Sequence, residues 1–229
     1  MQFGDLPTVH ATTLRRYTRS SSHPGVHQNT DVMVTADGRL RVPPIYAAVS
    51  RCFELGTATR WRRHDSIEIV CLMVSGTLAC EYIDGSTFAL GAEDVAVVST
   101  SSGLEYRWRS IGDEPARGLF FWLPARPNRA PRHTQYHAPR AQRIGELVAL
   151  AGIGTPAPIT APITVHSVVM ASGTSLTHAA GHRRCYIVPT LGPIAVEGVV
   201  AGPNSGVVGE GGVRTICALE STEVVIVET

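Results

Sequence analysis

The stretch that decides the fold spans residues 68–99 and reads EIVCLMVSGTLACEYIDGSTFALGAEDVAVVS. An apolar run to Val74 meets the turn signal Ser75-Gly76, and the chain returns through residues 77–83 to Asp84-Gly85. Asp-Gly between two β-prone runs is a strong hairpin signal, because both residues tolerate the positive φ of a tight turn. Two further short runs, separated by a second turn, complete the stretch. It therefore predicts an antiparallel β module.

The pattern continues outward from this stretch on both sides. The run 104–109 and the run 118–123 complete the first module, which ends near Pro124. Four prolines and several arginines then indicate a connecting loop over 124–139. Residues 142–150 fit either a helix or a strand. A second, smaller β module has predicted strands over residues 163–171, 185–190, 194–200, 215–218 and 224–227.

The predicted fold class is all-β, with two consecutive antiparallel β-barrel (jelly-roll) modules. The predicted division places a first barrel, which carries the candidate site, in residues 1–125. A connecting segment takes residues 126–160, and a smaller barrel takes residues 161–229.

The chain of 229 residues has 20 basic residues, and all of them are arginine. The absence of lysine excludes a Schiff-base lysine, an internal aldimine with pyridoxal phosphate and a Walker-type phosphate loop, since each needs a lysine amine. The net charge of +1, with the arginines dispersed, gives no basic stripe for nucleic acid. We therefore expect a small-molecule partner and no nucleic acid, and the oligomeric state stays open.

Five cysteines without any C-x-x-C spacing lie mostly in apolar runs, which indicates buried thiols in a reducing compartment. Residues 1–7 have no basic or apolar signal region, and no apolar stretch approaches the length of a membrane span. We expect a cytoplasmic protein with no membrane partner.

A family resemblance lies in Gly56-x5-Arg62-x-His64-x3-Glu68-x7-Gly76, which is similar to the first motif of the cupins. Residues 101–106 lie where the second cupin motif is expected. The spacing of the first motif, the run Phe-Phe-Trp-Leu-Pro at 120–124 and the shorter second module resemble the pirin branch of the bicupins. The resemblance implies a bicupin fold over roughly residues 20–228.

In the pirin pattern an iron ion is held by a His-x-His pair and a later His-x-Glu pair. Those positions are occupied here by Arg62, His64, Tyr106 and Trp108, and the broader cupin pattern adds Glu68. An arginine is always protonated and cannot donate a lone pair to a metal. We therefore expect no metal and no other cofactor at this site.

The altered motif offers acid–base groups in place of metal ligands. Strand alternation places positions 62, 64, 66 and 68 on one face, and the resemblance implies that this face is the barrel interior. His64 and Glu68 could then relay a proton, with Tyr106 as a donor. Arg62 could anchor a carboxylate or phosphate, and Trp108 could stack on a planar ring. The competing interpretation is structural: Arg62 and Glu68 form an internal ion pair while the two aromatic residues fill the emptied pocket.

Other candidate groups give weaker signals. His133 and His137 lie among prolines, so they are interpreted as exposed loop residues and not as a metal pair. The same interpretation applies to His178 and His182, in a glycine-bounded turn. The second module carries only scattered glutamates and is predicted to be structural.

Three functions remain open from the sequence. The first is a metal-independent acid–base enzyme of specialised metabolism, acting on a small aromatic or conjugated molecule by cyclisation, condensation of the Pictet–Spengler type, isomerisation or elimination. The second is an iron-dependent dioxygenase of the quercetin-cleaving kind, which the pirin resemblance implies. The third is a ligand-binding or regulatory protein without catalysis.

Overall fold

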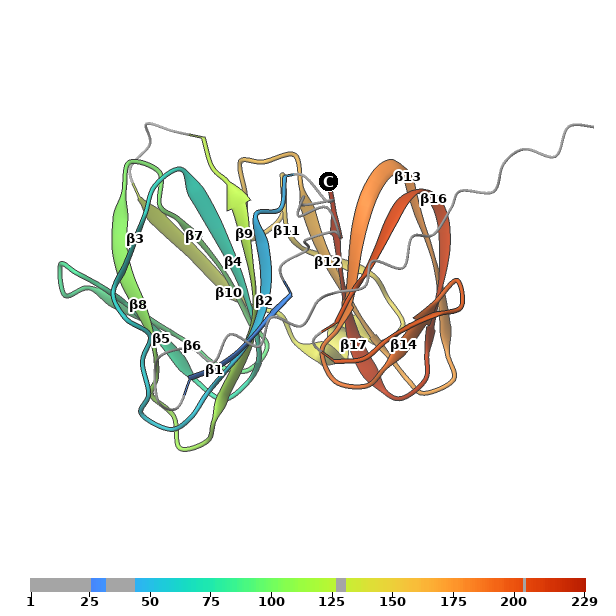
Figure 1. Ribbon diagram of the computed structural model, residues 1–229, viewed down its shortest axis with the longest axis horizontal. Helices are drawn as coiled ribbons and strands as arrows, with labels where there is room; N and C mark the ends of the chain where they lie inside the picture. Colours follow the sequence, from blue (N-terminus) through green and yellow to red (C-terminus); the bar gives the residue numbers. More distant parts are fainter. Residues whose placement is uncertain (1–25, 32–43, 127–130, 204) are drawn as a thin grey trace, which may run out of the picture.

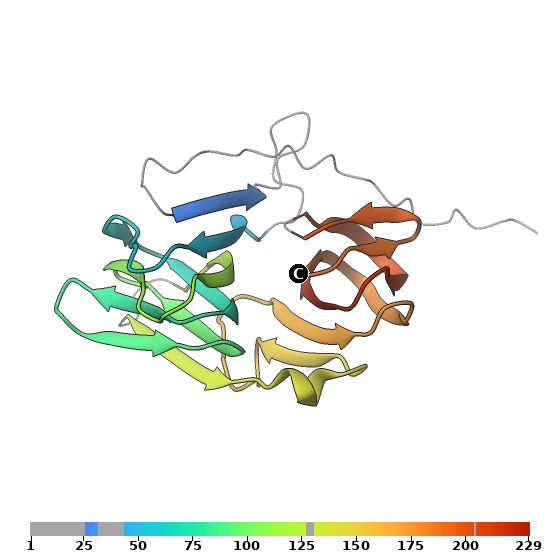
Figure 2. The same cartoon turned by 90° about the horizontal axis from the view of Figure 1, so that it is seen from below.

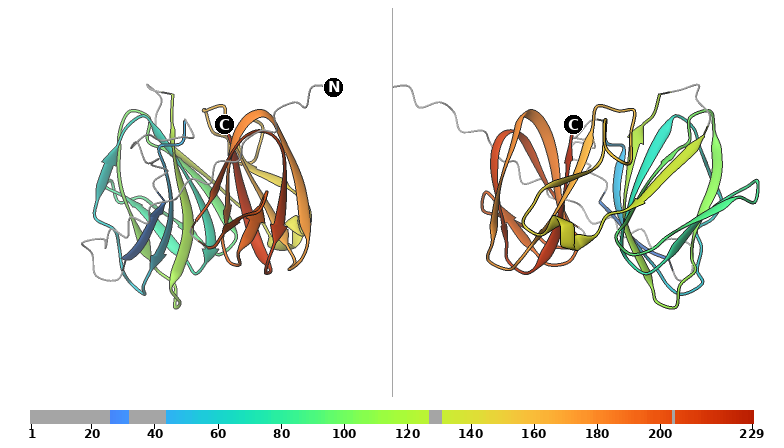
Figure 3. Two further views of the ribbon diagram at one scale, coloured as in Figure 1. Left: turned by 45° about the vertical axis from the view of Figure 1, so that its right-hand side comes forward. Right: turned by 180° about the vertical axis from the view of Figure 1, so that it is seen from behind.

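The computed structural model describes residues 26–31, 44–126, 131–203 and 205–229, and its described part is almost entirely β-structure. Two antiparallel barrels lie side by side (Figures 1 and 3). The predicted fold class of two consecutive jelly-roll modules is confirmed. The first seven residues, where the sequence shows no targeting signal, lie outside the described residues.

Two sheets form the N-terminal barrel. The six-stranded sheet has the order β1-β2-β9-β4-β7-β10, and the four-stranded sheet has the order β3-β8-β5-β6. The first sheet contains β1 (Val26–Asp31), β2 (Ala47–Phe53), β9 (Ala116–Pro124), β4 (Ile67–Ser75), β7 (Asp94–Ser99) and β10 (Arg132–His137). The second contains β3 (Arg62–His64), β8 (Leu104–Ser110), β5 (Leu78–Tyr82) and β6 (Thr87–Leu90).

One seven-stranded sheet curls into the C-terminal barrel, in the order β11-β12-β17-β13-β16-β14-β15. Its strands are β11 (Val148–Ala151), β12 (Thr164–Met170), β17 (Thr222–Glu228), β13 (Ser175–Pro189), β16 (Val207–Ala218), β14 (Ile194–Val196) and β15 (Val199–Ala201). The register between β13 and β16 shifts around Gly181, where a positive φ of 61° lets the long pair bend. The predicted turn holding His178 and His182 is therefore wrong, because both residues lie within β13.

The hairpin signals of the opening stretch are confirmed by the pairing of β5 with β6 and by the turn at Gly76. Gly76 has a φ of 69°, and a Cβ atom there would lie 2.6 Å from the Ala116 backbone. Only glycine fits such a close approach with a left-handed backbone. This steric limit accounts for the last glycine of the first motif.

The six-stranded sheet is buried on both faces along its central strands β9, β4 and β7, so it separates two of the three apolar cores. In β4, Ile69 and Cys71 belong to the core inside the N-terminal barrel, whereas Val70 and Leu72 belong to the core between the barrels. Val165 and Val227 of the second barrel contribute to that shared core. The third core fills the C-terminal barrel. Figure 2 shows the two barrels side by side in a second view.

The predicted loop over residues 124–139 contains a strand. β10 pairs antiparallel with β7 from Arg132 opposite Ser99 to His137 opposite Asp94. A proline cannot donate a ladder hydrogen bond, and Pro131 and Pro139 lie just outside this edge strand, where the missing donor does no harm. The histidines of this strand are exposed but not in a loop, and the His133 ring stacks on Phe88 with 4.2 Å between centroids.

Residues 142–150, for which the sequence allows either a helix or a strand, contain parts of two elements. They are the end of a single 3₁₀ turn, η1 (Arg140–Arg143), and the first part of β11 (Val148–Ala151). Within the described ranges, no helical segment has the length and apolar content of a membrane span.

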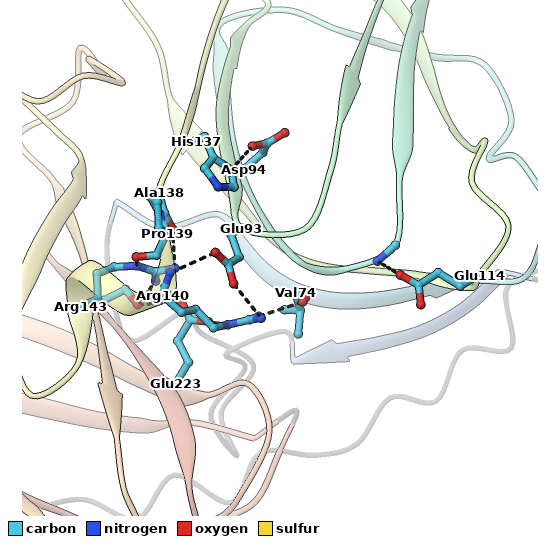
Figure 4. A network of polar contacts seen from close by, with 12 residues as sticks. Val74, Glu93, Asp94, Glu114, His137, Ala138, Pro139, Arg140, Arg143 and Glu223 are labelled. Carbon is cyan, nitrogen blue, oxygen red and sulfur yellow. Dashed lines mark hydrogen bonds and ion pairs between the residues drawn. The ribbon is translucent and has the colours of Figure 1, made fainter.

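Arg140 of η1 ties the barrels together, and Arg143 fixes the connecting segment to the second barrel (Figure 4). Arg140 donates to the Val74 carbonyl at 2.8 Å in the first barrel and to Glu223 at 2.9 Å in the second. Arg143, which is 3% exposed, pairs with Glu223 and donates to the Ser167 hydroxyl at 2.6 Å. Burial alone would raise the pKa of Glu223, but Arg143, Ser167 and Arg140 together hold it below its ordinary value.

Replacing Arg143 tests this junction. Arg143→Met leaves a buried carboxylate short of one partner, and we expect a loss of about 3–5 kcal/mol in the free energy of unfolding, measured by urea titration at pH 7. The control is Arg183→Met, which removes a side chain that is 55% exposed while Glu228 keeps its contact with His178, and it should cost less than about 1 kcal/mol. If the two variants lost equal amounts of unfolding free energy, Arg143 would not have the stabilising role proposed for it.

Candidate functional site

The first motif changes its alternation at one turn. Arg62 lies opposite Tyr106 in the pairing of β3 with β8, so both side chains lie on the inner face of the four-stranded sheet. Ser66 has a φ of 52°, and β4 begins directly after it. This left-handed residue shifts the alternation by one position, because each strand residue otherwise faces opposite to its neighbour. Ile67 therefore faces the barrel interior, and Glu68 faces away from it.

The predicted placement of Glu68 is wrong for this reason. Its side chain is fully buried between the barrels, where Oε2 accepts hydrogen bonds from the Thr160 amide at 2.7 Å and the Thr160 hydroxyl at 3.1 Å. Burial raises the pKa of Glu68, and the Thr160 hydrogen bonds oppose that shift. Glu68 therefore neither joins His64 in the cavity nor forms the alternative ion pair with Arg62.

Arg62 and His64 are brought together at an open cavity of about 340 Å³ in the mouth of the N-terminal barrel. The lining residues are Tyr46, Ala47, Val49, Arg51, Arg62, His64, Ile67 and Trp122. None of these described residues is an aspartate or a glutamate. The cavity is at the lower end of the range for small-molecule sites, about 300–1,000 Å³, and it combines apolar walls with a few polar groups.

His64 is supported from behind by Tyr106. The Tyr106 hydroxyl lies 3.0 Å from His64 Nδ1. Burial raises the pKa of Tyr106 to about 12, so the hydroxyl stays protonated at neutral pH. The pKa of His64 is lowered by burial and by the charges of Arg62 and Arg51. A neutral imidazole therefore faces the cavity, and Tyr106 orients its ring.

Trp108 does not take the predicted position against the cavity. It is 1% exposed and lies in the barrel core, edge-on to Phe120 at 5.3 Å between ring centroids. The aromatic wall of the cavity is Trp122 from β9. In the sequence, Trp122 stands out only as part of the family-like run 120–124, although alternation along β9 places it on the inner face together with Phe120.

Arg51 is the site residue that the sequence analysis missed. It lies on β2 between Val49 and Phe53, both of which belong to the interior core. Its guanidinium carbon is 5.4 Å from the Phe120 ring centroid and 5.0 Å from that of Trp122. Burial and the charge of Arg62 lower its pKa to about 10. The available signal was its position between two apolar residues on alternating positions of a short β-prone run.

A metal does not fit this site. Of the motif positions, only His64 offers a neutral nitrogen donor, and its Nδ1 already contacts Tyr106. Two guanidinium groups at the same cavity repel a dication. Over the described ranges of the chain, no group of three or more His, Cys, Asp or Glu side chains is arranged to hold a metal ion. The donor set thus falls short of the three or four ligands that transition-metal sites use.

The second barrel holds a buried polar cluster that the sequence analysis also missed. His178 Nε2 lies 2.7 Å from Glu228 Oε1, and His166 Nε2 lies 3.8 Å from Glu228 Oε2. Arg183 contacts the same carboxylate at 3.3 Å. The interpretation of His178 as an exposed residue is wrong, since it is 6% exposed. One carboxylate here balances several cationic or titratable groups inside the barrel.

The electrostatic setting of His64 can be measured by NMR titration. We expect its pKa to lie below 6.5 in the native protein, because burial and two arginines disfavour the imidazolium. Arg62→Gln should raise that pKa by removing one of these charges. The matched control Arg109→Gln removes a charge that is paired with Glu81 outside the cavity, and should leave it unchanged. A His64 pKa unaffected by Arg62→Gln would contradict the described geometry.

Comparison with known proteins agrees with the architecture. No protein-family model matches the chain. A Pseudomonas aeruginosa protein with the provisional name quercetin 2,3-dioxygenase and a pirin-like protein of Caulobacter vibrioides are each 30% identical over 172 residues, which cover 72% of this chain and 74% of each relative.

Solved structures show the same fold at low identity. The bacterial pirin YhhW from Escherichia coli, in complex with nickel(II), superposes with a TM-score of 0.78 at 15% identity, covering 93% of this chain and 96% of that one. Quercetin 2,3-dioxygenase from Acinetobacter baumannii gives a TM-score of 0.67 at 14% identity, covering 82% and 75%. Together with the two sequence relatives, the architecture shows that this chain belongs to the pirin-like family of bicupins.

Proposed function

We propose that the N-terminal barrel binds a planar aromatic molecule of the polyphenol class and acts on it by acid–base chemistry, without a metal. The observation that carries this proposal is the position of His64 at an open cavity of about 340 Å³, with the Tyr106 hydroxyl 3.0 Å from its Nδ1 atom. Trp122 supplies a flat wall for an aromatic ring. The ligand class follows the similarity to proteins named quercetin 2,3-dioxygenase.

The chemistry that these groups support is a proton shift. In the tautomer whose Nδ1–H donates to the Tyr106 hydroxyl oxygen, His64 has its lone pair on Nε2. That atom removes a proton from an acidic C–H or O–H of the ligand, and the electron pair stays on the ligand as an enolate or phenolate. Arg51 and Arg62 stabilise that anion. The imidazolium then returns its proton to a different atom of the ligand. This sequence describes an isomerisation, and the same groups serve an elimination or a ring closure.

A second candidate function is oxygen-dependent cleavage of a flavonol. The names of the Pseudomonas and Acinetobacter relatives favour it. The donor set at His64 does not support it, since the other three positions of the pirin pattern hold Arg62, Tyr106 and Trp108 in place of metal ligands. A third outcome is binding without turnover, which would make the chain a ligand-binding protein.

Proton chemistry can be tested in heavy water without oxygen and with a chelator present. We expect quercetin or a related polyphenol to incorporate deuterium or to isomerise, as followed by mass spectrometry. His64→Gln should lower the rate by about 100-fold or more, the usual range for loss of a general base. His182→Gln, an exposed histidine of the other barrel, is the matched control and should retain the full rate.

Each other result assigns a different function. Turnover that requires oxygen and stoichiometric metal, measured by oxygen consumption and elemental analysis, would replace the proposal by the dioxygenase. Binding detected by calorimetry with no turnover under either condition would leave a non-catalytic ligand-binding protein.

A further inference from the structure

Arg51 is a buried cation without a described counterion. Its side chain is 2% exposed, and its Nε atom is buried with no hydrogen-bond partner in the described part of the chain. Removing a guanidinium from water is strongly unfavourable unless it is paired. Contacts with the Phe120 and Trp122 rings offset only part of that cost. The guanidinium therefore lies ready for an anion that is not part of the described chain.

A second guanidinium faces the same space. Arg62 comes from β3 in the opposite sheet and lines the same cavity as Arg51. The described residues offer neither of them an ion pair, whereas arginines elsewhere, such as Arg107 and Arg140, are paired with glutamates. Two unpaired cations that converge on one cavity, with no acidic residue in its described lining, favour a negatively charged ligand.

The groups that line the cavity favour a carboxylate over a phosphate. A guanidinium presents a flat fork of N–H groups that matches a carboxylate with two parallel hydrogen bonds. Phosphate sites usually add backbone N–H groups from a glycine-rich loop or a helix N-terminus, and neither occurs among the described lining residues. Trp122, Ile67 and Val49 provide an apolar wall for the rest of the molecule.

We propose that Arg51 and Arg62 clamp the carboxylate of a planar aromatic acid whose ring lies against Trp122. This inference rests on the proposed small-molecule site and narrows its polyphenol ligand to aromatic molecules that carry a carboxylate. Arg51 is then the residue that determines specificity, since it alone is buried and held in place by two rings. Arg62, which is exposed at the mouth, closes over the carboxylate from the other side.

The test compares each acid with its uncharged amide of the same shape. Benzoate and 2-naphthoate are titrated against benzamide and 2-naphthamide by calorimetry at pH 7, alongside 2-naphthyl phosphate. We expect each acid to bind about 10- to 100-fold more tightly than its amide, the range for charge-assisted hydrogen bonds. Arg51→Met should reduce that ratio to about 2-fold or less while amide binding is kept.

Two further variants keep the test decisive if Arg51→Met does not fold. Arg62→Gln changes an exposed residue and should lower the acid-to-amide ratio several-fold. Arg51→Lys keeps the charge but removes the fork, so it should give an intermediate ratio. The control Arg109→Gln removes a charge paired with Glu81 and should leave the ratio unchanged.

The outcomes separate this inference from the proposed function. Equal affinity for acids and amides overturns the carboxylate clamp and leaves an aromatic site. Tighter binding of naphthyl phosphate than of naphthoate also overturns the carboxylate assignment. If no acid, amide or polyphenol binds at all, the proposed function fails together with the inference.

Discussion

The six-stranded sheet of the N-terminal barrel is buried on both faces along its central strands β9, β4 and β7, and this double burial limits how both barrels can be built. Its inner face fills the barrel and supports the cavity, and its outer face meets the second barrel. Every side chain of its central strand must therefore fit one of two apolar environments. Glu68 is the polar residue placed on the outer face, where Thr160 supplies its hydrogen bonds. A single left-handed residue, Ser66, decides which environment Glu68 enters.

The chemistry of the cavity follows from the exchange of metal donors for cations. Arg62 occupies a motif position where a metal-binding histidine is expected. Arg51 adds a second positive charge from the adjoining sheet. Both charges disfavour protonation of His64, so the imidazole remains neutral. The cavity therefore combines a neutral base with fixed positive charge. An arrangement of this kind stabilises an anion while leaving the base free to accept a proton.

Much of the fold could be predicted from local signals, since strand alternation, Ser-Gly and Asp-Gly turns and the apolar runs act over a few residues. The predictions failed where distant contacts decide the structure. β10 is flanked by prolines that suggest a loop, yet β7 offers it a free edge with six paired positions. The bend in β13 at Gly181 resembles a turn in the sequence, and its pairing with β16 makes it part of a strand.

Residue type and short spacing are local properties, so the all-β class, the cupin-like motif and the arginine at an expected metal-ligand position could be predicted without a structure. Which of the motif residues meet depends on the tertiary fold. Backbone conformation at Ser66 removed Glu68 from the cavity, and the packing of β2 beside β9 brought Arg51 to Trp122. Side chains from strands far apart in the sequence share a site only after the barrel closes. A local sequence pattern cannot predict which of them will then lie close together.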